Sequence, residues 1–162
     1  MTSRLKALLV FFIILSAVPC LSEASEKDTF VKYVIDGDTI TVPGGESVRY
    51  IGIDTPERGE PFYMEARQRN LSLVKGKKVT LVFCDNERRD KYGRLLAWVY
   101  AGGVFVNEVL LKEGLARRLP IPPCGTMFSD EFKAAEKAAR DKRLGIWADK
   151  AVPGSEMRVP LR

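Results

Sequence analysis

The sequence contains no histidine and only three cysteines among its 162 residues. Without histidine, the chain has no Ser-His-Asp or Cys-His nucleophile system, no histidine-based proton transfer and few routes to a zinc site. Any hydrolytic chemistry must therefore use carboxylates, arginine, lysine, tyrosine and a hard metal ion. The net charge of +5 is compatible with a polyanionic partner, but many proteins without such a partner are equally basic, so the charge alone decides nothing.

Long apolar runs are also scarce, and the one that stands out lies near the N-terminus. Two basic residues precede an apolar run over residues 7–18, and the small residues Ser22 and Ala24 follow it. This pattern is typical of a secretory signal peptide, and the run is short for a transmembrane helix. We therefore predict a signal peptide over residues 1–24, cleaved after Ala24, and a secreted or periplasmic protein. An uncleaved membrane anchor is the alternative.

Two cysteines, Cys84 and Cys124, remain after this cleavage. In an oxidising compartment a disulfide between them is the expected state, and two free thiols are the alternative. Such a bridge would close a loop of about 40 residues and stabilise the fold by roughly 4 kcal/mol in the chain-entropy treatment. The rest of the chain is long enough for one domain, which we place over residues 25–150, with a flexible tail over 151–162.

Hydrophobic periodicity and turn signals predict five or so short strands and three helices. The expected elements are strands within residues 30–53, a helix over 62–77, strands over 78–83 and 94–101, a helix over 106–114, a short strand over 115–119 and a helix over 129–143. Ser129 is expected to be the N-cap of the last helix. This order suits a mainly β protein with packed helices, of the α+β class. The specific expectation is a five-stranded Greek-key barrel of the OB type with three helices outside it.

Two aspartates lie astride a glycine in the stretch VIDGDTITV. Asp-Gly is a common hairpin signal, so a plain turn is one interpretation. In an extended chain, however, Asp36 and Asp38 would project to one face, and a second acidic stretch with Asp54 and Glu57 follows the next strand. If the strands of Asp38 and Asp54 are neighbours, their oxygens could surround one cation, and oxygen ligands select calcium or magnesium. A metal site is therefore the second interpretation.

Two arginines favour the metal interpretation. Arg49 precedes Asp54 by five residues, on the opposite side of a regular strand, so a bend is needed to bring the two together. Arg94 ends the turn DKYGR. Pro56 restricts the chain before Glu57 and would hold this carboxylate near the metal without making it a ligand. Two guanidinium groups, a hard cation and a free carboxylate are the groups needed to cleave a phosphodiester, although single arginines more often form surface ion pairs.

Five stretches together resemble the staphylococcal nuclease (thermonuclease) family. In order and spacing they are VIDGDTITV, VRYIGIDTPE, DKYGRLLAWVY, VNEVLLKEGLA and LGIW, and they cover roughly residues 30–148. The resemblance implies the OB-type barrel with three helices and a calcium-dependent endonuclease. Its substrates would be DNA and RNA, preferably single-stranded, and its products 3′-phosphorylated. A monomer is expected, and nothing in the resemblance points to a protein partner. A non-catalytic OB-fold module that binds nucleic acid or protein is the alternative, and a scaffold with a structural ion is a third.

The resemblance also assigns a calcium site. Asp38 and Asp54 are similar to the carboxylates that bind the ion directly, and the Thr55 main-chain carbonyl to a further ligand. Asp36 is similar to the outer acid that contacts the ion through water. Calcium is therefore the expected cofactor.

Further residues match positions that act on the substrate. Arg49 and Arg94 are similar to the phosphate-binding pair of the family, and Glu57 to the group that activates the attacking water. Lys91 and Tyr92 resemble residues that touch the terminal phosphate of a bound nucleotide.

The sequence departs from the family pattern at three places. The loop RGEPF after the DTPE motif is short, which affects the expected substrate affinity more than the chemistry. Where the family has an aromatic residue after its Gly-Leu-Ala run, this chain has Leu119 and Pro120. We therefore expect base stacking to come from Tyr92 alone or to be weak. Cys84 and Cys124 have no counterpart in the staphylococcal protein.

Overall fold

The computed structural model describes residues 25–84 and 87–148. The predicted signal peptide over residues 1–24 and the tail over 151–162 lie outside the described residues. No helix within the described ranges is long and apolar enough to cross a membrane.

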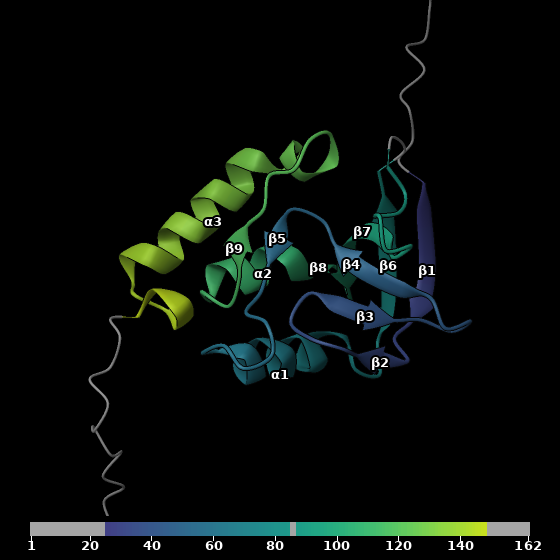
Figure 1. Ribbon diagram of the computed structural model, residues 1–162, viewed down its shortest axis with the longest axis horizontal. Coiled ribbons are helices and arrows are strands. Elements are labelled where there is room, and N and C mark those ends of the chain that lie inside the picture. Colours follow the sequence, from purple (N-terminus) through teal and green to yellow (C-terminus); the bar gives the residue numbers. More distant parts are fainter. Residues whose placement is uncertain (1–24, 85–86, 149–162) are drawn as a thin grey trace, which may run out of the picture.

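The described residues form nine short strands, arranged in two sheets (Figure 1). They are β1 (Glu26–Phe30), β2 (Tyr33–Val34), β3 (Thr39–Thr41), β4 (Ser47–Tyr50), β5 (Ile53–Asp54), β6 (Lys78–Phe83), β7 (Leu95–Ala101), β8 (Val104–Phe105) and β9 (Arg117–Arg118). The larger sheet has the order β1-β6-β7-β4-β3-β2, with β8 also paired to β7. Its pairs are antiparallel except for β4 with β7. The second sheet is the antiparallel pair of β5 and β9.

The α+β class with three helices is confirmed, but the strands are shorter and more numerous than the five expected. The stretch over residues 30–53 is divided by the Asp-Gly-Asp turn, by the turn over residues 43–46 and by a bend at Ile51 and Gly52. In the described part of the chain, β1 and β2 end the strand order and do not pair with each other. Closure of the sheet into a barrel therefore stays a prediction.

Three helices pack beside the sheets. They are α1 (Tyr63–Val74), α2 (Val106–Lys112) and α3 (Ser129–Asp141), and two short 3₁₀ turns, η1 (Cys124–Thr126) and η2 (Gly145–Trp147), flank α3. Helix α2 packs against both α3 and β7, and Figure 1 shows it between α3 and the large sheet. The N-cap prediction for Ser129 is wrong. Phe128 occupies that position and Ser129 is already helical, so its hydroxyl is one residue too late to cap the helix.

The centre of the large sheet shows the two-residue period expected of a strand with one face on the core. Val79, Leu81 and Phe83 of β6 are buried and alternate with more exposed residues. Burial of one such side chain is worth about 1.5–3 kcal/mol. In β7, Trp98 packs edge to face against Phe128, with the ring centres 5.1 Å apart. This core supports β4 and the residues that follow it.

The small sheet is attached to α3 by a buried carboxylate. Glu136 accepts hydrogen bonds from the Arg118 amide at 3.0 Å and from its Nε at 3.2 Å. Arg118 belongs to β9, whose partner strand β5 ends at Asp54. Helix α3 therefore helps to fix the position of Asp54.

Candidate functional site

The Asp-Gly-Asp sequence is the turn between β2 and β3. The Ile35 amide donates to the Thr39 carbonyl at 2.9 Å, and the Asp38 amide donates to Asp36 Oδ1 at 3.0 Å. The expectation of an extended chain with both carboxylates on one face is therefore wrong, because the Asp36 carboxylate folds back onto the main chain. The turn interpretation is correct, and it leaves Asp38 directed elsewhere.

Asp38 is buried, with 4% of its surface exposed. Its Oδ2 accepts hydrogen bonds from the Thr55 amide at 2.7 Å and the Thr55 hydroxyl at 2.8 Å, and its Oδ1 accepts one from the Thr39 hydroxyl. The same Oδ2 lies 3.1 Å from Arg49 Nη1. The pKa of Asp38 is raised to about 6, mainly by burial; the Arg49 charge opposes this rise and the Asp36 charge adds to it. The buried carboxylate therefore favours additional positive charge beside it.

Arg49 of β4 joins two acidic residues from different segments. Its Nη1 contacts Asp38, as described above, and its Nη2 donates to Asp54 Oδ1 at 2.8 Å. Nη1 also donates to the main-chain carbonyls of Ile53 at 2.8 Å and Tyr50 at 3.0 Å. The Nε–H makes no hydrogen bond with another described residue, so Arg49 keeps a donor for a ligand.

A bend between β4 and β5 makes the contact between Arg49 and Asp54 possible. Gly52 has a φ of 80°, which favours glycine, and a Cβ at this position would lie 2.7 Å from Phe132 Cε2 of α3. The chain thus bends at a glycine that lies close against α3. The structure has the bend that the sequence spacing required.

The oxygens around Arg49 have the chemistry of a calcium site. Within residues 25–84 and 87–148, no three acidic or cysteine side chains converge closely enough to hold a metal ion alone. Asp38 and Asp54 nevertheless reach one guanidinium group, so their carboxylates already share a positive charge. Their donor atoms are oxygens, which suit a hard cation whose remaining ligands are carbonyl and water oxygens. The residues present therefore fit calcium.

The second arginine, Arg94, is held by a short turn. Asp90 Oδ1 accepts hydrogen bonds from the amides of Tyr92 at 2.9 Å and Arg94 at 3.0 Å, and Asp90 Oδ2 accepts one from Arg94 Nε at 2.7 Å. Burial raises the pKa of Asp90, but these hydrogen bonds outweigh it and hold the pKa below its ordinary value. The guanidinium carbon lies 5.4 Å from the centre of the Tyr92 ring, and Lys91 Nζ lies 5.0 Å from it.

Asp90 was not predicted from the sequence as a residue of the site. It directs the Arg94 side chain through the ion pair just described, and so acts through another residue. A signal was present in the sequence, since an aspartate that begins a glycine-containing turn commonly accepts hydrogen bonds from the amides that follow. Its position four residues before Arg94 identifies the partner.

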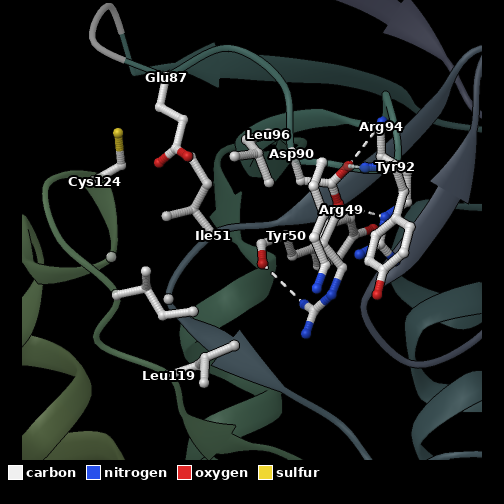
Figure 2. A pocket seen from close by; sticks show the side chains of 14 residues that line it. Arg49, Tyr50, Ile51, Glu87, Asp90, Tyr92, Arg94, Leu96, Leu119 and Cys124 are labelled. Atoms are coloured by element: carbon white, nitrogen blue, oxygen red, sulfur yellow. Dashed lines mark hydrogen bonds and ion pairs between the residues drawn. The ribbon is translucent and has the colours of Figure 1, made fainter.

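Arg49 and Arg94 line one pocket of about 350 Å³. Figure 2 shows both side chains gathered with Tyr92 on one side of this pocket, with Leu119 and Cys124 across from them. Lys91 lines it too. The two arginines predicted to bind phosphate therefore face the same space, and one of them contacts both predicted calcium ligands.

Glu57 has no contact that draws it into this arrangement. It is exposed, and its amide donates to Glu60 Oε2 at 2.8 Å. Among the described residues, its carboxylate has no hydrogen-bond or ion-pair partner, and it does not line the pocket of Arg49 and Arg94. A free carboxylate is what its predicted role requires, and its place beside the substrate stays a prediction.

A disulfide joins Cys84 and Cys124, whose Cα atoms lie 5.9 Å apart. Cys84 directly follows β6, whereas Cys124 begins η1 and lines the pocket. The bridge therefore connects the end of a central strand to the segment that carries Leu119. This segment forms the side of the pocket where the family resemblance places an aromatic residue.

Comparison with known proteins agrees with this geometry. The family described as "Staphylococcal nuclease homologue" matches residues 47–149. The SPbeta prophage-derived endonuclease YokF of Bacillus subtilis (strain 168) is 43% identical over 130 residues, which are 75% of this chain and 44% of YokF. Endonuclease YncB of the same organism is 44% identical over 123 residues, 70% of this chain and 58% of YncB. Thermonuclease of Staphylococcus hyicus is 36% identical over 138 residues, 80% of each chain.

The matched region contains most of the site. Arg49, Asp54 and Arg94 all lie within residues 47–149. The chain spans about half the length of the two Bacillus relatives and most of the Staphylococcus one. The family match covers more than half of the chain, and the thermonuclease match covers most of both proteins. The chain belongs to the staphylococcal nuclease family.

Proposed function

We propose that this protein is a calcium-dependent endonuclease that hydrolyses phosphodiester bonds of DNA and RNA and leaves 3′-phosphorylated products. The observation that carries the proposal is the position of Arg49, which contacts Asp38 and Asp54 and lines the same pocket as Arg94. The names of the relatives, endonuclease and thermonuclease, support the same activity.

In this proposal Asp38 and Asp54 hold calcium directly, the Thr55 main-chain carbonyl is a further ligand, and Asp36 acts through water. The ion, when bound, neutralises charge on the phosphate under attack. The buried state of Asp38 supports this assignment, because a poorly solvated carboxylate gains most from a nearby cation. We also propose that the large sheet closes into an OB-type barrel, as the family resemblance implies.

The arginines act on the substrate. Arg49 and Arg94 would bind the non-bridging phosphate oxygens, since planar guanidinium groups match their geometry and offset the charge of the transition state. Glu57 would take a proton from the water that attacks phosphorus. As the new P–O bond forms, the bond to the 5′-oxygen breaks, and this oxygen takes up a proton from solvent water and leaves as a 5′-hydroxyl group. The phosphate therefore stays on the 3′ side.

We propose single-stranded nucleic acid as the preferred substrate, bound by a monomer. Tyr92 is 72% exposed, with Lys91 and Arg94 close to its ring. An exposed aromatic ring beside cations suits an unpaired base and its phosphates. Leu119, across the pocket, offers an aliphatic surface instead of a second aromatic ring. Stacking would therefore depend on Tyr92.

We propose that the protein is exported through residues 1–24. The order of basic, apolar and small residues supports this, and the disulfide of Cys84 with Cys124 is of the kind that forms in oxidising compartments. N-terminal sequencing of the exported protein is expected to begin at Ser25. Recovery of the full-length chain in the membrane fraction would favour the uncleaved anchor.

A digestion assay tests the proposed activity. Purified protein is incubated with denatured DNA or RNA, with calcium or with a chelator. Fragments with 3′-phosphate ends are expected only with calcium. If both nucleic acids stay intact over a wide pH range, the alternative of an OB-type binding module is favoured. Fragments with 3′-hydroxyl ends would mean a different cleavage geometry.

The role of Glu57 has its own test. Glu57→Gln is expected to retain calcium and nucleotide affinity while kcat falls by about 10²–10⁴, the range for loss of a general base. Glu65→Gln is the matched control, because Glu65 is an exposed glutamate in the first turn of α1. Unchanged kcat in Glu57→Gln would remove Glu57 from the mechanism.

A further inference from the structure

The Asp-Gly-Asp turn rests directly on α1. A Cβ at Gly37 would lie 2.8 Å from the Ala66 Cβ of α1 and 2.6 Å from Thr55 Oγ1, so only glycine allows this approach. Thr55 is also the residue that donates two hydrogen bonds to Asp38. The turn is therefore held in a narrow space between α1 and the residue after β5.

A buried asparagine on α1 connects this turn to β4. Asn70 is fully buried, and its Nδ2 donates to the main-chain carbonyl of Asp36 at 3.1 Å. Its Oδ1 accepts a hydrogen bond from the Tyr50 hydroxyl at 2.9 Å. Tyr50 is also buried, and it directly follows Arg49 in β4. One amide group thus links the segment that carries Asp38 to the strand that carries Arg49.

We propose that Asn70 is a positioning residue for the calcium site. Together with the Tyr50 hydroxyl, it fixes the separation between the β2–β3 turn and β4, and hence the position of Asp38 relative to Arg49. As a claim about calcium, the inference rests on the proposed function. It adds Asn70 and the Tyr50 hydroxyl, which are buried and bond to each other.

The chemistry of the link requires an amide. The carbonyl of Asp36 needs a donor and the Tyr50 hydroxyl needs an acceptor, and an asparagine supplies both from one short side chain. A leucine of similar size at position 70 would leave both groups unpaired in the core. Phenylalanine at position 50 would remove only the Tyr50–Asn70 half of the link.

Calcium titration calorimetry on the intact protein tests the proposal. Asn70→Leu is expected to raise the calcium dissociation constant by about tenfold or more, as observed when partners of metal ligands are removed, and Tyr50→Phe by a smaller factor. Val79→Ala is the control, because Val79 is a fully buried residue of β6 that takes no part in the hydrogen bonds of this link. It should lower Tm without changing calcium affinity. Unchanged calcium affinity in both Asn70→Leu and Tyr50→Phe would overturn the proposal.

Hydrogen exchange in the metal-free protein gives a readout that does not depend on the proposed function. The Asp38 amide bonds within the turn and the Thr55 amide bonds to Asp38 Oδ2. Both are expected to exchange about tenfold faster in Asn70→Leu than in Val79→Ala. Equal exchange in the two variants would overturn the positioning role. Wild-type protein that binds no calcium would refute the proposed function instead. If Asn70→Leu does not fold, Tyr50→Phe carries the same comparison.

Discussion

The two arginines of the pocket are held in different ways. The Arg49 side chain is 12% exposed and contacts acidic groups of two other segments, Asp38 and Asp54. The Arg94 side chain is 32% exposed and is held by Asp90, only four residues earlier. The whole fold is therefore needed to place Arg49, whereas a local turn places Arg94.

Because of this difference, we expect the two arginines to contribute differently to the stability of the fold. Removal of one member of a buried ion pair leaves an uncompensated charge, which typically costs about 3–5 kcal/mol. An exposed pair contributes roughly 0–1 kcal/mol. Substitution of the two arginines should thus reduce activity alike but affect unfolding very differently.

The largest effect is expected for Arg49→Met. Loss of a phosphate-binding donor should reduce kcat/KM by about 10²–10³. The free energy of unfolding without calcium should also fall by about 3 kcal/mol, since Asp38 stays buried without its partner. Calcium should restore part of this loss, because it binds only the folded state. Nuclease assays and urea unfolding measure both effects, and unchanged stability would contradict the buried-pair description.

Arg94→Met is the matched comparison. We expect a fall in kcat/KM of the same order, about 10²–10³. The free energy of unfolding should change by less than about 1 kcal/mol, because the Asp90–Arg94 pair is local and partly exposed. The same two assays apply. A stability loss equal to that of Arg49→Met would mean that the two arginines do not differ as described.

A smaller effect is expected for Tyr92→Leu. Loss of one base-stacking ring should raise KM for single-stranded DNA by about tenfold and leave kcat nearly unchanged. Tyr33→Leu is the control, because Tyr33 of β2 is also an exposed tyrosine beside a lysine. Steady-state kinetics of both variants measure this effect. Equal KM values for Tyr92→Leu and Tyr33→Leu would show that Tyr92 takes no part in substrate binding.

The smallest effect concerns Asp90→Asn. The folded-state pKa of Asp90 is lowered, so this carboxylate stabilises the fold above its unfolded-state pKa, and the contribution is lost as the pH falls through the folded-state pKa. The variant should therefore be less stable than the wild type by about 1 kcal/mol or less at neutral pH. The difference should vanish in acid, below the ordinary titration range of an aspartate. Urea unfolding at both pH values would show this, and a difference independent of pH would contradict it.

Local features of the site followed from the sequence. The turn that ends at Arg94 is marked by its aspartate and glycine, and all its hydrogen bonds join residues close in sequence. The bend before Asp54 could also be predicted. Residues 49 and 54 would lie on opposite faces of a regular strand, so Arg49 and Asp54 could not share a ligand without a bend. The helices followed from their apolar periodicity.

Features that depend on contacts between residues far apart in the sequence could not be predicted from it. The Asp36 carboxylate binds the main chain of its own turn instead of lying beside that of Asp38, since the turn is pressed against α1 at Gly37. Asn70 bonds to Tyr50 and Asp36, which lie 20 and 34 positions away in the sequence, and no short sequence motif indicates this link. Strand number was also misjudged, because short bends divide runs that look continuous in the sequence.

The central claim is that the carboxylates beside Arg49 bind calcium, and calorimetric titration of Asp54→Asn tests it most directly. The wild type is expected to bind one calcium ion per chain, and Asp54→Asn to weaken that binding by more than about tenfold, because calcium affinity follows the number of charged ligands. Asp141→Asn, at the exposed end of α3, is the control and should bind as the wild type does. Equal calcium affinity in Asp54→Asn and the wild type would contradict the account.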